Sequence, residues 1–155
     1  MDAHSRILIL GSLPGQASLS AGQYYAHPRN QFWRLLGDIL AQPLAEMAYA
    51  ARLECLLAHG IGLWDVVARA ERRGSLDAAL RQVSHNDLLT LLAARPQLRL
   101  LAFNGATAWR ARKPLLGAEI AMLPLPSSSP AYTLDYASKL AVWRNITQYL
   151  SSARR

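Results

Sequence analysis

The chain is poor in cysteine, with Cys55 as the only one among its 155 residues. An intramolecular disulfide is therefore excluded, and so are zinc sites and iron–sulfur clusters that depend on several cysteine ligands. Cys55 stands before two leucines, where a small, buried apolar residue is the ordinary interpretation of a lone cysteine.

Other signals are absent as well. No spacing of histidines and carboxylates indicates a metal site, and neither glycine-rich pattern of the nucleotide-binding folds occurs, so we expect no metal and no cofactor. No apolar run is long enough to span a bilayer, and the N-terminus lacks the basic and apolar regions of a signal peptide. The sequence thus predicts a cytoplasmic protein without a membrane segment.

The chain has few charged residues, and more of them are basic than acidic. Charged residues are 17% of the chain, and the basic ones exceed the acidic ones to give a net charge of +7. All but two of the basic residues are arginines, which bind phosphate with two hydrogen bonds at once. A basic surface favours polyanions. An arginine-rich composition also follows from a GC-rich genome, so both explanations stay open.

The hydrophobic content of 52% is enough for one globular domain over residues 1–155, which we expect to be monomeric. Short apolar runs predict four strands separated by amphipathic helices, which is typical of a parallel sheet covered on both faces. The sequence therefore predicts an α/β fold, a three-layer α/β/α sandwich with a four-stranded parallel sheet. The expected strands are 6–10, 61–67, 98–103 and 119–123, and the expected helices are 31–41, 45–58, 87–94, a short one through 109, and one from 133 with Leu140, Trp143, Thr147 and Leu150 buried.

Two loops carry the residues that suggest chemistry. The first is Gly11-Ser12-Leu13-Pro14-Gly15 with the segment 24–33 behind it, and it follows a predicted strand, at the end where α/β proteins bind ligands. It resembles the first motif of the uracil-DNA glycosylase superfamily, and most closely that of its hypoxanthine-DNA (deoxyinosine) glycosylase branch, family 6. The second, Pro126-Ser127-Ser128-Ser129-Pro130, resembles the last motif of the superfamily, a Pro-Ser loop that grips the DNA backbone.

The resemblance implies a monofunctional DNA glycosylase. Such an enzyme hydrolyses the N-glycosidic bond of a deaminated base, here most closely hypoxanthine, that is flipped out of DNA, and it leaves an abasic site for base excision repair. The implied partner is DNA that contains deaminated bases, which would associate the protein with the nucleoid of a bacterial-type cell. Three alternatives remain: a mismatch-type uracil-DNA glycosylase, a non-catalytic DNA-binding relative, and, more distantly, an α/β domain that binds a small molecule.

Asn30 is the catalytic candidate. Its amide oxygen accepts a hydrogen bond from water without titrating near neutral pH, so it would align a nucleophile rather than act as a strong base. Mismatch-specific uracil glycosylases have, at the position of Leu13, an asparagine that binds the attacking water. Leucine cannot accept a hydrogen bond, which supports assigning this role to Asn30 instead. Asn30 also stands just before an amphipathic helix, so a purely structural helix cap is the competing interpretation.

The resemblance also implies a set of base-binding residues. Tyr25 would stack on the flipped base, and backbone N–H groups of Ser12 and Leu13 would bond its carbonyl, with Gly11 permitting the close approach. Asp65, at the end of the second predicted strand, would read the N1–H of hypoxanthine. Tyr25 could instead pack as an ordinary core or loop residue. Asp65 could instead cap a turn or form an ion pair with Arg69 or Arg72.

The expected contacts to the DNA backbone come from His27 and the Pro-Ser loop, namely Pro126, Ser127, Ser128 and Ser129. His27 is equally suited to anchoring its own loop. The loop departs from the superfamily motif at two positions. Leu125 replaces the histidine or asparagine that usually opens the motif, and Ser129 stands where relatives have a leucine that inserts into the base stack as a wedge. Tyr132 is the candidate to insert in its place. Asn104-Gly105, after the third predicted strand, is interpreted as a structural turn.

Overall fold

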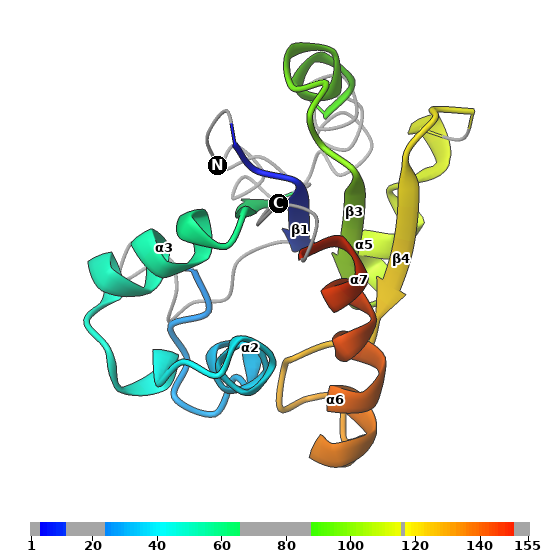
Figure 1. Cartoon of the computed structure of the whole chain (residues 1–155). Coiled ribbons are helices and arrows are strands. Elements are labelled where there is room, and N and C mark those ends of the chain that lie inside the picture. The colour runs from blue at the N-terminus through cyan, green and yellow to red at the C-terminus, as the bar shows by residue number, and fades with distance from the viewer. Residues whose placement is uncertain (1–3, 12–23, 66–87, 116, 151–155) are drawn as a thin grey trace, which may run out of the picture.

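The computed structural model describes residues 4–11, 24–65, 88–115 and 117–150 (Figure 1). Its centre is a sheet of four parallel strands, each five residues long, in the order β2-β1-β3-β4. The strands are β1 (Ile7–Gly11), β2 (Ile61–Asp65), β3 (Leu100–Asn104) and β4 (Ala121–Leu125). The predicted four-stranded parallel sheet is therefore confirmed.

Helices lie against both faces of this sheet (Figure 1). The α-helices with assigned bounds are α2 (Phe32–Leu40), α3 (Tyr49–Ala58), α5 (Ala106–Arg110), α6 (Tyr136–Trp143) and α7 (Thr147–Leu150), and a further helical segment covers 88–94. In the described ranges, short 3₁₀ turns join them: η1 (Leu44–Glu46), η3 (Lys113–Leu115) and η4 (Arg144–Ile146).

The alternation of side chains along β1 separates two hydrophobic cores. Ile7 and Ile9 pack with α2, α3 and α6, whereas Leu8 and Leu10 pack with the 88–94 helix, α5 and η3. All four side chains are fully buried, as expected for a central strand of a parallel sheet that is covered on both sides. The three-layer α/β/α arrangement predicted from the sequence is confirmed by this division.

Element boundaries depart from the prediction where local geometry breaks the helical period. The predicted helix 45–58 is divided, because Met47 and Ala48 are extended between η1 and α3. The C-terminal helix begins at Tyr136, where the Asp135 carboxylate accepts a hydrogen bond from the Ser138 N–H at 3.0 Å and caps it. Thr147, predicted to be buried, is exposed, because the tighter turn of η4 shifts the register.

The topology determines where a site can form. From β1 the chain moves to β2 on one side, and then crosses to β3 on the other side of β1, so β1 and β3 flank the switch point of the sheet. Gly11 pairs in register with Asp65, and Asn104 with Leu125, so the four strands end at one edge. Gly11, the first residue of the first motif, and Leu125, the residue before the Pro-Ser loop, both lie at this edge.

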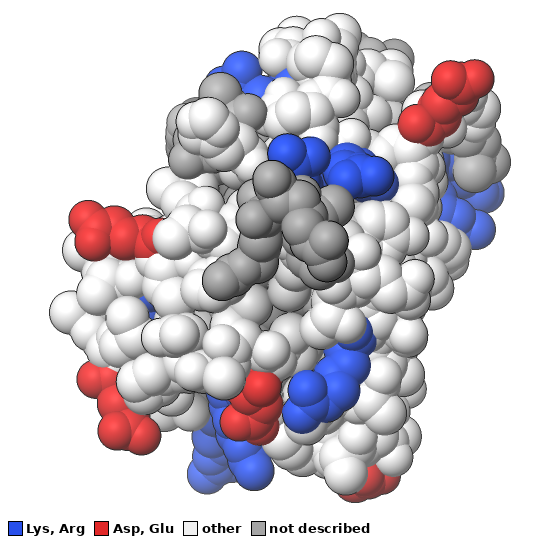
Figure 2. All heavy atoms as spheres, viewed as in Figure 1, with Lys and Arg blue, Asp and Glu red and all other residues white. Residues whose placement is uncertain are grey.

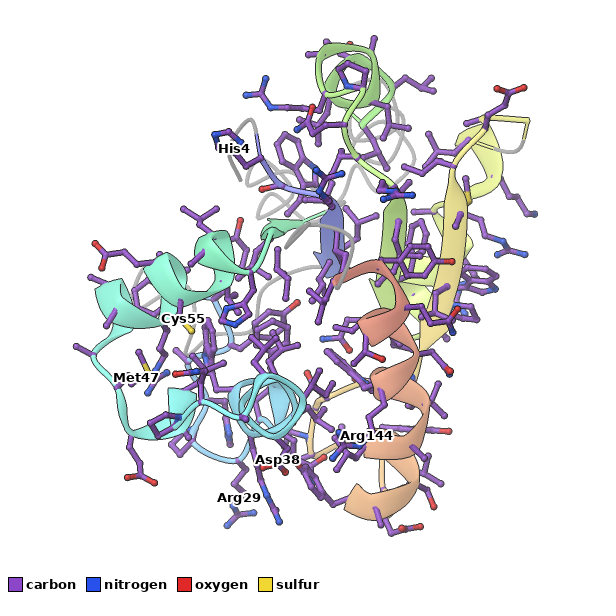
Figure 3. All side chains as sticks on the ribbon, viewed as in Figure 1. His4, Arg29, Asp38, Met47, Cys55 and Arg144 are labelled. Atoms are coloured by element: carbon purple, nitrogen blue, oxygen red, sulfur yellow. The ribbon has the colours of Figure 1, made fainter. Side chains whose placement is uncertain are left out.

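Polar contacts join α2 to α6 beside the site. The Tyr136 hydroxyl donates a hydrogen bond to the Asp38 carboxylate, and the Arg34 guanidinium lies 3.7 Å from the centre of the Tyr136 ring. Figure 3 shows Asp38 and Arg144 at this boundary. Burial, followed by the bond to Asp38, raises the pKa of Tyr136. No helix in the described part of the chain is long and apolar enough to cross a membrane.

Candidate active site

Asn30 lies at the entry to α2, and its side chain is bonded in two directions. The amide oxygen Oδ1 accepts one hydrogen bond from the Phe32 N–H at 2.9 Å and another from the Ser128 hydroxyl at 2.8 Å. The first bond satisfies the first N–H of α2 from two residues before it, as in an Asx turn. The N-cap of α2 is Gln31, without a side-chain cap bond, so the cap position expected for Asn30 is wrong by one residue. The second reaches 98 residues along the chain, to the Pro-Ser loop. Asn30 therefore combines a local structural contact with a long-range one.

Ser128 connects the Pro-Ser loop to the end of β3. Its N–H donates to Oδ1 of Asn104 at 3.0 Å, and its Oγ accepts from Nδ2 of Asn104 at 2.9 Å. Its carbonyl accepts a further bond from the Gln31 N–H at 2.9 Å. Ser128 is 1% exposed and Asn104 8% exposed, so the network is largely shielded from water, which strengthens it.

The backbone donors fix the direction of every bond in this network. A backbone N–H can only donate, so Phe32 and Ser128 each face an amide oxygen, of Asn30 and Asn104 respectively. Nδ2 of Asn104 must then donate to the Ser128 hydroxyl, whose own proton is left for Oδ1 of Asn30. The interpretation of Asn104 as a purely structural turn residue was incomplete, because its side chain orders the catalytic candidate through Ser128.

Lys139 of α6 binds the residue after Asn30 and the Pro-Ser loop, and the sequence analysis did not predict this role. Its side chain is 1% exposed, and Nζ donates to Oε1 of Gln31 at 2.9 Å and to the carbonyl of Ser129 at 3.2 Å. Burial lowers the pKa of Lys139. The signal in the sequence is a lysine one position before Leu140, on the inner side of an amphipathic helix, where a lone cation needs fixed acceptors.

Tyr25 is held in a specific orientation. Its ring stacks on that of Phe32 with the centroids 3.9 Å apart and the planes at 15°. Its backbone has φ of 54°, in the left-handed region that tyrosine seldom adopts, and such backbone strain concentrates at functional sites. The structure therefore orients the ring expected to stack on a base, and Phe32 supports it from one side.

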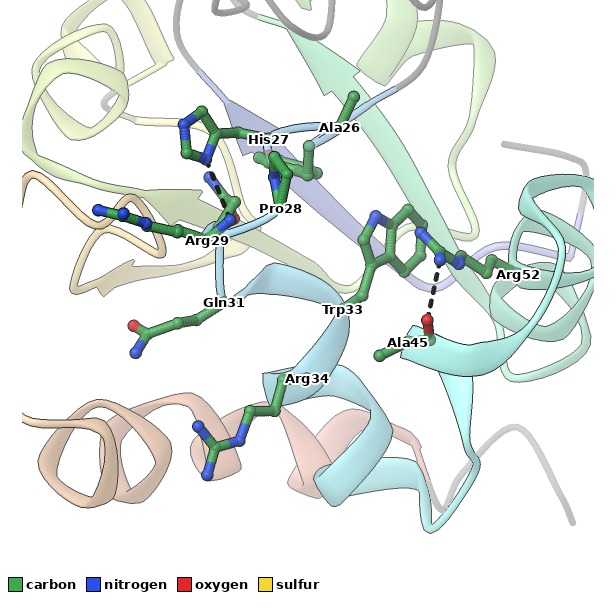
Figure 4. A pocket seen from close by; sticks show the side chains of 11 residues that line it. Ala26, His27, Pro28, Arg29, Gln31, Trp33, Arg34, Ala45 and Arg52 are labelled. Atoms are coloured by element: carbon green, nitrogen blue, oxygen red, sulfur yellow. Dashed lines mark hydrogen bonds between the residues drawn. The ribbon is translucent and has the colours of Figure 1, made fainter.

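A cavity of about 550 Å³ lies between the loop before α2 and the start of α3 (Figure 4). Its lining includes Tyr25, His27 and Asn30. On the far wall Arg52 donates to the carbonyls of Ala45 and Met47, both at 3.0 Å, so its guanidinium is held by backbone acceptors. The predicted catalytic residue Asn30, the predicted base-stacking residue Tyr25 and the predicted phosphate contact His27 thus line one cavity.

His27 both anchors its loop and keeps a donor. Its Nδ1 accepts a hydrogen bond from the Arg29 N–H at 3.0 Å (Figure 4). This contact agrees with the alternative prediction that His27 anchors its own loop. An accepting Nδ1 places the proton of a neutral imidazole on Nε2, which is then a hydrogen-bond donor. The ring is exposed, so this donor is available to a phosphate.

The other residues of the Pro-Ser loop form turns. The hydroxyls of Ser127 and Ser129 accept bonds from the N–H groups of Ser129 and Ala131, both at 3.1 Å, and the carbonyl of Pro126 accepts from the buried Trp143 indole at 2.9 Å. Tyr132, the substitute wedge, is 48% exposed.

The first motif is only partly described. Gly11 is buried at the end of β1, whereas Ser12, Leu13 and the side chain of Asp65 lie outside the described residues. No group of three histidine, cysteine or carboxylate side chains suited to a metal occurs within the described ranges. On the face shown in Figure 2, basic and acidic side chains are scattered over a mainly uncharged surface.

Comparison with known proteins identifies the family. The family model described as the uracil DNA glycosylase superfamily matches residues 1–151. The chain belongs to the uracil DNA glycosylase superfamily. Within that superfamily it is similar to a hypoxanthine DNA glycosylase of Methanosarcina acetivorans, with 38% identity over 96% of this chain and 94% of the relative.

Two further comparisons support this placement. A hypoxanthine DNA glycosylase of Methanosarcina barkeri is 45% identical over 68% of this chain and 66% of its own length. A Methanosarcina acetivorans protein solved by solution NMR has 39% identity and a TM-score of 0.81, over 97% of this chain and 94% of that one. The resemblance inferred from the two motif loops is thus confirmed.

Proposed function

We propose that this superfamily member is a monofunctional hypoxanthine-DNA glycosylase. It would hydrolyse the N-glycosidic bond of deoxyinosine in DNA and release hypoxanthine from an abasic site. One observation carries the proposal: the two segments that resemble glycosylase motifs meet at the bond between Asn30 and Ser128, at the switch point of the sheet. The similarity to two hypoxanthine DNA glycosylases supports the choice of base.

The described residues suggest how such a substrate binds. The cavity beside Tyr25 receives the flipped base, and the aromatic pair of Tyr25 and Phe32 offers a rigid surface for stacking. The exposed donor of His27 and the partly exposed Ser127 and Ser129 of the Pro-Ser loop contact the phosphates on either side, without preference for sequence. Ser128, expected from the sequence to join them, is buried and bonded to Asn104 and Asn30, so it is left out of this set. Asn30 is the proposed catalytic residue, because it lines the cavity and its amide is held in one orientation.

The reaction requires no cofactor in this proposal, and we propose that the protein acts as a cytoplasmic monomer. Lys139, one of the two lysines, is buried and bonded to Gln31 and Ser129, which supports hydrolysis by water over a Schiff-base step on that amine.

Single-turnover base release from matched oligonucleotides tests the proposal. The lesions are deoxyinosine, deoxyuridine, deoxyxanthosine and none, and the variants are wild type, Asn30→Ala and the control Asn145→Ala. Asn145 is exposed and bonds only the nearby Val142 carbonyl among the described residues, so its loss should not change release. We expect abasic sites from deoxyinosine that are lost in Asn30→Ala alone.

Release of uracil instead of hypoxanthine would assign the chain to the mismatch-type activity. DNA binding without release of any base would refute the enzymatic proposal and leave a binding module, and the absence of DNA binding would favour a small-molecule-binding domain.

A further inference from the structure

The two polar atoms of the Asn30 amide are in different situations. An amide oxygen has two lone pairs, and Oδ1 already accepts from the Phe32 N–H and the Ser128 hydroxyl. No residue in the described part of the chain bonds to Nδ2, although Asn30 lines the cavity. The amide therefore offers the cavity two N–H donors in place of an acceptor.

We propose that Asn30 acts through Nδ2 as a hydrogen-bond donor to the departing purine, and that Ser128 and Asn104 are positioning residues that hold it in this role. The proposal rests on the proposed function and replaces the water-aligning amide oxygen expected from the sequence.

The chemistry of the cleavage explains why a donor is useful. As the C1′–N9 bond breaks, its electron pair stays with the purine and spreads over N3, N7 and O6. Water adds to C1′ and gives up one proton, which the purine takes up, so the products are hypoxanthine and an abasic sugar. A donor aimed at the purine stabilises charge that exists only as the bond breaks, and removing one such donor typically lowers kcat by about 10²–10³-fold. A donor to the attacking water would withdraw electron density from the nucleophile instead.

The network prevents the amide from turning over. A flipped Asn30 would place Nδ2 against the Phe32 N–H, so that two donors would face each other. The Ser128 proton holds Oδ1 from a second side, and Nδ2 of Asn104 keeps that proton directed at Asn30. Ser128 and Asn104 are not among the residues that line the cavity, so in this proposal they act through Asn30.

Asn30→Asp separates the two roles of the amide. The carboxylate keeps both acceptor bonds, to Phe32 and to Ser128, but replaces the donor with a second acceptor. We expect the release of hypoxanthine at pH 7 to fall by about 10²-fold or more, as in Asn30→Ala. As the pH falls, protonation of the new carboxyl restores an O–H donor, so the residual activity of Asn30→Asp should rise. A residue that aligned or activated water would give the opposite slope, with activity retained at pH 7 and increasing with pH.

Ser128→Ala tests the positioning role. In the wild-type background it should lower kcat and leave DNA affinity unchanged. In the Asn30→Ala background it should have no further effect on kcat, because the residue through which it acts is gone. The control Ser138→Ala, at an exposed serine on α6, should leave kcat unchanged in both backgrounds.

The outcomes separate the two proposals. If wild type releases no base, the proposed function fails. If wild type releases hypoxanthine but Asn30→Asp does so within about threefold of it at pH 7, or Ser128→Ala lowers kcat equally in both backgrounds, the donor role is overturned while the glycosylase assignment stands.

Discussion

Gly105 follows Asn104 at the end of β3, and its replacement by alanine tests whether the end of β3 and the Pro-Ser loop form one unit. Its backbone has φ of 96° and ψ of 163°, a region that is essentially restricted to glycine. A Cβ built there would lie 3.3 Å from Cβ of Ser127, tighter than ordinary contact. The substitution therefore strains the backbone and presses on the residue before Ser128.

Gly117 separates these two effects. It has a similar φ of 101°, but a Cβ there would meet nothing within 4 Å. Gly117→Ala should lower the free energy of unfolding by the backbone cost alone, about 1–3 kcal/mol. Gly105→Ala should add the cost of overpacking against Ser127, about 1–3 kcal/mol more.

Urea unfolding at pH 7 gives both free energies of unfolding, and single-turnover release from deoxyinosine reports the site. We expect Gly105→Ala to slow release and Gly117→Ala to leave it unchanged when both are assayed well below their unfolding midpoints. Removing the contact in Gly105→Ala/Ser127→Gly should recover part of the lost stability. Equal destabilisation by the two glycine variants, or wild-type release by Gly105→Ala, would refute the steric reasoning.

Three further substitutions test other parts of the structure. Trp143→Phe leaves the Pro126 carbonyl without its indole donor and should cost about 1–3 kcal/mol in urea unfolding; an unchanged midpoint would contradict this. Burial lowers the pKa of Lys139 below 10.5, so the unfolded chain keeps the Lys139 proton to higher pH than the folded chain does. The free energy of unfolding of wild type, relative to that of Lys139→Met, should therefore rise as the pH approaches 10.5. A difference that stays constant between about pH 7 and 10 would contradict this prediction. If the exposed Tyr132 is the wedge, Tyr132→Ala should slow release from double-stranded but not single-stranded deoxyinosine DNA, and an equal effect on both would exclude that role.

The sequence predicted the sheet well because a strand buried on both faces is an apolar run, and such runs are local. It also predicted that the motifs following the strands gather at one edge of the sheet, because the carboxyl ends of parallel strands lie at the same edge. It did not predict the break at Met47 and Ala48, since only contacts with the folded core decide whether a helix continues through such residues. Nor did it place Asn104 or Lys139 in the site. Asn104 bonds Ser128, 24 residues away, and Lys139 bonds Gln31, 108 residues away, and Ser129 on a separate loop. No local pattern records such bonds.

The structural and catalytic interpretations of Asn30 are compatible because they use different atoms. Oδ1 accepts from the first N–H of α2 and from the Ser128 hydroxyl, while Nδ2 remains for the cavity. Stability and activity should therefore separate in a predictable way. Asn30→Ala removes the acceptor of both bonds and the donor together, so it should lose about 1–3 kcal/mol of unfolding free energy as well as activity.

Asn30→Asp keeps both bonds, because a carboxylate oxygen accepts from the Phe32 N–H and the Ser128 hydroxyl as the amide oxygen does. Its free energy of unfolding at pH 7 should stay closer to that of wild type than that of Asn30→Ala does, although release of hypoxanthine falls by about 10²-fold or more. Urea unfolding of the two variants beside wild type measures this. If Asn30→Asp is as destabilised as Asn30→Ala, the bonds to Oδ1 do not stabilise the fold, and the orientation of the amide must be set by something other than Phe32 and Ser128.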